Sequence, residues 1–190
     1  MDPILTWRQP FVPGRGGSAE TDWLQPFKPA GPVDLDGASG ADATGHLAGV
    51  ALYELGYFWE AHEVWEPQWM RCRPNSRERS ALAGLIQLAN ACLKIRMGRL
   101  PASRRVLTSA QQHWAEARSG SDAPVLGIDA SAMVRQIDAF VSYLGHAVRG
   151  EGGDAALHMV LAERPPLVLV GGSAEHLPAS RNAVVAACQR

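Results

Sequence analysis

The stretch Tyr57-Phe-Trp-Glu-Ala-His-Glu-Val-Trp-Glu-Pro-Gln-Trp-Met70 mixes acids and a histidine with large apolar side chains. On a helix, which turns by about 100° per residue, His62, Glu63 and Glu66 fall within one quarter-turn arc. The large apolar residues on or beside that arc are Phe58, Trp59, Trp69 and Met70. Ionisable groups must be paired or hydrogen-bonded once they are buried. The stretch therefore predicts a buried His-Glu-Glu cluster.

The apolar pattern on both sides of this stretch predicts an all-α fold. Apolar residues recur at helical spacing over about 44–55, 57–70, 77–97, 101–117 and 130–148. The 77–97 helix is apolar around most of its circumference and should be central. We expect a single-domain bundle of about five main helices. Shorter helices near 154–163 and 180–190, with an extended segment over 165–170, complete the prediction.

Composition shifts divide the chain into three parts. Residues 1–43 form an extended Pro/Gly-rich N-terminal arm, 44–150 the helical-bundle domain, and 151–190 a C-terminal extension packed on the bundle. The arm carries two similar pieces, Pro10 to Gly14 and Pro26 to Gly31. Either it wraps on its own domain through its aromatic residues, or it docks to a partner or a second subunit. A homodimer is therefore one hypothesis.

Charge and cysteine content exclude several classes of protein. The 190 residues carry 18 Lys and Arg against 19 Asp and Glu, so no bulk charge attracts nucleic acid or anionic lipid. The three cysteines lie far apart and support neither a disulfide framework nor a thiolate zinc site. No apolar run reaches the roughly 18 residues that a membrane span needs. We expect a cytoplasmic protein with no nucleic-acid or membrane partner.

A polar stripe on the 77–97 helix is the expected counterpart of the His-Glu-Glu cluster. Gln87, Asn90 and Lys94 recur at spacings of three and four among small residues such as Ala83 and Gly84. Amide and ammonium groups donate hydrogen bonds, and small residues let another helix come close. We infer that this stripe faces the cluster and that Lys94 balances its charge.

Metal binding is one interpretation of the cluster. His62, Glu63 and Glu66 could hold a divalent ion, with a missing ligand supplied by His46, His113, His146, His158 or His176. The zinc-protease pattern His-Glu-x-x-His is not met, because its second histidine is an acid here. A di-iron bundle would need a second Glu-x-x-His copy, which the chain lacks.

The same residues resemble a known family. The segment from Gly56 to Trp69 with its His-Glu-x-x-Glu-Pro-x-Trp run, followed by Leu85-Ile-Gln-Leu-Ala-Asn-Ala91 and Lys94, is similar to the small helical proteins called domain of unknown function 309. The resemblance covers roughly Thr44 to Ala117 and implies an all-α bundle. It implies signature positions at His62, Glu63, Glu66, Trp69, Gln87 and Lys94, and it brings no established activity.

Three hypotheses of function remain open from the sequence. The first is a binding module for a metal ion or small polar ligand, in which Glu63 and Glu66 accept hydrogen bonds or ligate and His62 ligates or carries a proton. The second is an interaction or scaffold protein in which the cluster, with Lys94, Gln87 and Asn90, is a structural polar network. The third is a metal-dependent hydrolase with Glu63 as base.

Overall fold

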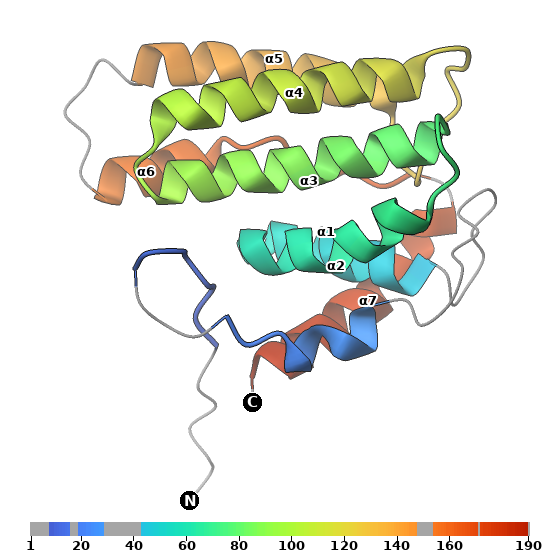
Figure 1. Ribbon diagram of the computed structural model, residues 1–190, viewed down its shortest axis with the longest axis horizontal. Coiled ribbons are helices and arrows are strands. Elements are labelled where there is room, and N and C mark those ends of the chain that lie inside the picture. The colour runs from blue at the N-terminus through green and yellow to red at the C-terminus, as the bar shows by residue number, and fades with distance from the viewer. Residues whose placement is uncertain (1–7, 16–18, 29–42, 148–153, 171, 190) are drawn as a thin grey trace, which may run out of the picture.

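The computed structural model describes residues 8–15, 19–28, 43–147, 154–170 and 172–189, and nearly all of the regular structure in them is helical (Figure 1). One 3-10 helix precedes the α-helices. In chain order the elements are η1 Asp22–Phe27, α1 Ala43–Glu54, α2 Phe58–Arg71, α3 Arg77–Arg96, α4 Leu100–Arg118, α5 Ala130–Ala147, α6 Asp154–Ala162 and α7 Gly172–Cys188. The predicted all-α bundle is confirmed.

The main helices follow one another through space in the order of the chain. Contacts join α1 to α2, α2 to α3, α3 to α4 and α4 to α5, while α6 lies against α3 and α7 against α1. Figure 1 shows this stack, with α3 in the middle. The central place predicted for α3 is confirmed, since its buried side chains run from Ala81 to Ile95.

Local sequence signals set the turns between these helices. Gly56 and Gly98 follow α1 and α3 with φ of 85° and 73°, a left-handed conformation that glycine adopts without steric cost. The hydroxyl of Ser76 accepts from the backbone N–H of Arg79 at 3.1 Å and so caps the start of α3. Pro101 lies in the first turn of α4, where its missing N–H is not needed.

Two glycines let neighbouring helices come close. A Cβ added at Gly49 of α1 would lie 2.2 Å from the indole nitrogen of Trp65 in α2. A Cβ at Gly84 of α3 would lie 2.7 Å from the ring of Trp114 in α4. Because both tryptophans are fully buried, each glycine sets how closely its helix pair approaches.

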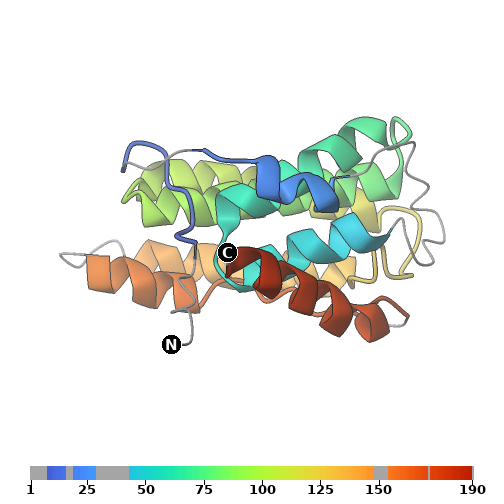
Figure 2. The same cartoon turned by 90° about the horizontal axis from the view of Figure 1, so that it is seen from below.

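The described parts of the N-terminal arm lie on the chain's own helices. Phe11 meets Trp59 edge to face with ring centroids 4.8 Å apart, and Trp23 meets Tyr57 at 6.3 Å. Viewed from below, η1 and α7 cover the side of α1 and α2 that faces away from α3 (Figure 2). The described aromatic pieces are therefore engaged within this chain.

The C-terminal part differs from its prediction in one respect. The last helix begins at Gly172 instead of near 180, and it continues through Pro178 to Cys188. The segment 165–170 is extended as expected, with an isolated bridge between Leu169 and Ile128. Within the described ranges there is no strand beyond such bridges, and no helix is long and apolar enough to cross a membrane.

Candidate functional site

A half-open pocket of about 430 Å³ lies where α2, α3 and α4 meet. The α2 side chains lining it, His62, Glu66 and Trp69, follow the spacing of four and three that places residues on one helix face. The α4 wall is formed by His113 and Glu116. The remaining lining residues are Asn75, Arg79, Ser80, Ala83, Ile86, Gln87 and Asn90. The pocket therefore combines charged, amide and apolar groups from three helices.

Four of the six predicted site residues meet at this pocket. His62, Glu66 and Trp69 of α2 line this pocket together with Gln87 of α3, so the Gln87 and Asn90 part of the polar stripe faces this side of α2. Glu63 and Lys94 are not among the lining residues. The pocket also includes two residues that the sequence analysis did not place there, His113 and Glu116.

The prediction that the His-Glu-Glu cluster is buried was wrong. The side chains of His62 and Glu63 are each 23% exposed, and Glu66 is half-buried. The buried face of α2 is the neighbouring arc, formed by Phe58, Glu60, Ala61, Val64, Trp65 and Gln68. Of the apolar residues used to orient the helix, Met70 is 62% exposed, and Trp59 and Trp69 are only half-buried. The large apolar residues of α2 therefore lie on two faces.

The cation that meets this cluster is also different from the one predicted. Lys28 Nζ lies 3.5 Å from Glu63 Oε2, and His62 Nδ1 lies 3.9 Å from Glu63 Oε1. Lys94 is half-buried near the other end of α3, and no ion pair joins it to Glu63 or Glu66, both of which the structure describes. Charge balancing by Lys94 is thus corrected to an ion pair from the segment preceding α1.

Arg79 lines the pocket and uses one nitrogen of its guanidinium in hydrogen bonds to the end of α2. Its Nη1 donates to the carbonyl oxygens of Trp69 at 2.8 Å and Cys72 at 3.3 Å. The guanidinium also lies over the Trp69 ring, 4.3 Å from its centroid. A cation at the C-terminal end of a helix is stabilised by the free carbonyl groups there, so Arg79 fastens the end of α2 to α3.

The α4 wall carries a small hydrogen-bonded group. His113 Nδ1 lies 3.4 Å from Glu116 Oε2, and the Ser80 hydroxyl donates to the same oxygen at 3.4 Å. Glu116 is 62% exposed, so this group is open to water. Its imidazole and carboxylate are available to a molecule that enters from solvent.

The arrangement does not support the metal interpretation. In the parts of the chain that the structure describes, no three His, Cys, Asp or Glu side chains are grouped so that they could hold a metal ion. His62, Glu63 and Glu66 therefore do not form a ready-made ligand set. Of the other histidines considered as ligands, His113 lines the pocket, His46 is buried elsewhere and His158 is exposed. The side chains of His146 and His176 lie outside the described residues.

Comparison with protein families assigns the middle of the chain. Residues 47–106 match the model described as domain of unknown function 309, DUF309. The match covers less than half of the chain, and it makes residues 47–106 similar to that family. The matched range covers most of α1, all of α2 and α3 and the start of α4, so it contains the α2 and α3 walls of the pocket but not His113 or Glu116. No curated protein and no solved structure matched the chain.

A second polar group in the matched region is buried, and the sequence analysis missed it. Glu60 is 3% exposed, and its Oε1 accepts from the backbone N–H of Phe11 at 2.8 Å, while Oε2 has no partner. Burial raises the pKa of this carboxyl group. Arg96 is the nearby cation, and its Nη1 donates to the carbonyl oxygen of Gly56 at 2.7 Å. Glu60 thus helps to hold the arm on α2.

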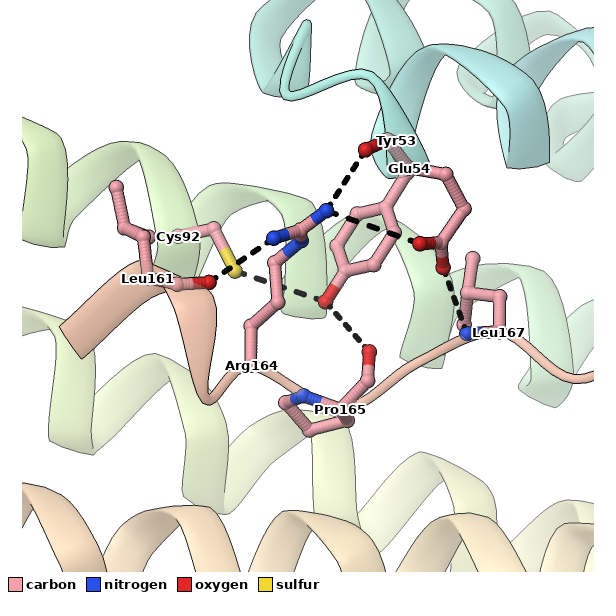
Figure 3. A network of polar contacts seen from close by, with 7 residues as sticks. All are labelled: Tyr53, Glu54, Cys92, Leu161, Arg164, Pro165 and Leu167. Carbon is pink, nitrogen blue, oxygen red and sulfur yellow. Dashed lines mark hydrogen bonds and ion pairs between the residues drawn. The ribbon is translucent and has the colours of Figure 1, made fainter. Parts of the chain in front are cut away.

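A third polar group fastens the C-terminal extension to the matched region (Figure 3). Arg164 donates to the carbonyl oxygens of Leu161 at 3.0 Å and Glu54 at 2.8 Å, and it lies 3.7 Å from the Glu54 carboxylate. The hydroxyl of Tyr53 donates to the carbonyl oxygen of Pro165 at 3.0 Å. The other Glu54 oxygen accepts from the N–H of Leu167 at 2.8 Å. This group is nearly saturated and has a structural role.

Proposed function

We propose that this protein binds a small polar molecule in the pocket between α2, α3 and α4. The proposal rests on three lining side chains that have no partner among the described residues. In the part of the chain that the structure describes, the side chains of Glu66, Gln87 and Asn90 have no hydrogen-bond or ion-pair partner, yet all three are half-buried around one hollow. None of their polar atoms is fully withdrawn from water, so a bound molecule can replace that water as their partner.

The shape of the pocket supports a small organic molecule. A volume of about 430 Å³ lies within the range of roughly 300–1,000 Å³ that is typical of small-molecule sites. Ala83, Ile86 and the Trp69 ring contribute apolar surface to its lining. In small-molecule sites the apolar surface buries the ligand and a few polar groups fix its orientation, and both kinds of group line this pocket.

The interaction-protein alternative gains nothing from the arm, because its described aromatic residues are engaged on the chain itself. The hydrolase alternative would need a metal, and the described acids and histidines are not grouped to hold one. No specific feature of the described residues supports either alternative.

The proposal can be tested by screening a mixed fragment collection of amines, acids and neutral polar compounds with two-dimensional amide NMR. We expect hits whose chemical-shift changes centre on α2 and α3 around the pocket. Asn90→Ala should weaken those hits several-fold, because it removes an amide that lines the pocket. Gln112→Ala is the matched control, since Gln112 is exposed on α4 and does not line the pocket. No hit at the pocket, or equal affinity in both variants, would count against the function.

A further inference from the structure

The charged side chains that line the pocket differ in how many partners they already have. The lining residues include two carboxylates, Glu66 and Glu116, and one permanent cation, Arg79. Arg79 already bonds two carbonyl oxygens at the end of α2 and stacks on Trp69. Glu66, by contrast, has no ion-pair or hydrogen-bond partner among the described residues. Carboxylates therefore outnumber permanent cations in the lining, and Glu66 is the carboxylate with no described partner.

The second carboxylate, that of Glu116, already has partners within the chain. Glu116 accepts from Ser80 and lies beside His113 at distances of 3.4 Å, so it is neutralised only when the imidazole is protonated. It lies on the α4 wall, and Glu66 lies on the α2 wall. The amides of Gln87 and Asn90 stand on α3 between these two walls and offer both donors and acceptors.

We infer, on the basis of the proposed function, that the ligand carries a protonated amine, with Glu66 as its counter-ion. An ammonium group close to a partly shielded carboxylate is attracted to it, whereas an anion at the same place is repelled. The apolar part of the ligand lies on Ala83 and Ile86, and the amides of Gln87 and Asn90 fix its orientation. The site is thus a selector of organic cations.

A matched series of probes tests the charge preference. The compounds 2-phenylethylamine, 2-phenylethanol and 3-phenylpropionate share an aromatic body and differ in the charge of the head group. Titration of the full chain, followed by amide NMR, gives a dissociation constant for each. We expect the amine to bind at least fivefold more tightly than the alcohol, and the carboxylate to bind most weakly. The affinity for the amine should fall as salt is added, because exposed charges are screened.

Two variants assign the preference to one carboxylate. Glu66→Gln should weaken 2-phenylethylamine about fivefold or more while leaving 2-phenylethanol unchanged. Glu78→Gln removes the same charge from α3 at a position that does not line the pocket, and it should change neither affinity. Equal losses in the two variants would overturn the role given to Glu66.

The outcomes separate this inference from the proposed function. If the alcohol or the carboxylate binds at the pocket as tightly as the amine, the charge preference is wrong and the binding function stands. If none of the three probes perturbs the pocket residues, the preference for amines is also wrong. The fragment screen then decides the proposed function, which falls if that screen too finds nothing at the pocket.

Discussion

The guanidinium of Arg164 meets a carboxylate and two carbonyl oxygens, whereas the carboxylate of Glu66, in the described parts of the same chain, meets no hydrogen-bond or ion-pair partner. Both side chains are partly buried. The first lies within a network that joins a distant segment to α1, in which the buried Nε of Arg164 has no hydrogen-bond partner. The second lies at the wall of a half-open pocket. A polar network that is satisfied internally fixes a structure, and polar groups left unsatisfied around a hollow are available for binding.

The largest effect that we expect is a response to acid, and it comes from a buried histidine that lies outside both regions. His46 is 3% exposed and bonds the carbonyl oxygen of Leu126 at 3.0 Å, and burial lowers its pKa from 6.5 to about 4. Its contribution to folding is complete above pH 6.5 and is lost as the pH falls toward 4. The resulting loss in the free energy of unfolding is about 3 kcal/mol at pH 4.

Urea unfolding at pH 7.5 and pH 4 measures this loss, and an NMR titration of the histidines assigns it. Glu60 acts in the opposite direction, because a carboxyl whose pKa is raised by burial favours the folded state below its unfolded pKa and opposes it as the pH rises. His46→Gln retains Glu60. The difference in acid sensitivity between this variant and the parent chain therefore excludes the contribution of Glu60. Gln112→Ala, a change on the exposed side of α4 that removes no titratable group, should keep the full acid sensitivity. A native His46 that titrates near pH 6.5 would contradict the prediction.

Within the network around Arg164, loss of one hydroxyl should cost about 1 kcal/mol of unfolding free energy. Tyr53→Phe removes the donor to the carbonyl oxygen of Pro165 and leaves that oxygen without its partner in a buried place. Thermal or urea unfolding checks the value. Tyr143→Phe is the control, since Tyr143 is 38% exposed, and it should be neutral. Equal stability of Tyr53→Phe and the parent chain would show that the network is not needed.

At the pocket, the corresponding change should have the smallest effect on stability. Glu66→Gln removes a charge that has no partner among the described residues, so we expect the free energy of unfolding to change by less than about 0.5 kcal/mol. The same urea experiment measures it. A loss comparable with that of Tyr53→Phe would mean that Glu66 belongs to a structural network, and the contrast between the two regions would disappear.

The helices could be predicted because the information is local. Apolar periodicity, the glycines at 56 and 98 and the proline at 101 placed α1 to α5 within a few residues. The start of α7 was missed because Gly172 and Pro178 lie inside the helix, and both residues usually mark its limits. Contacts with α1 compensate for these poor helix formers, and such contacts cannot be read from the segment itself.

The site was predicted only in part because its walls come from separate segments. His62, Glu66, Trp69 and Gln87 line one pocket, and the helical spacing that groups them on α2 and α3 is a local property. Their role in binding stays a prediction. The face of α2 was misplaced, because tryptophans occur on both its buried and its half-buried sides. The roles of Lys28, His113 and Glu116 depend on contacts between distant segments, and no spacing rule shows them.

The contact between Gly49 and Trp65 has a consequence for how DUF309 sequences diverge. Both positions fall inside the matched range 47–106. Gly49 has no side chain, and the indole of Trp65 fills the space that a side chain there would occupy. A relative with alanine or serine at the position of Gly49 should therefore have lost the indole at the position of Trp65. Such paired replacement would keep α1 packed against α2, with a larger side chain at the position of Gly49 and a smaller one at the position of Trp65.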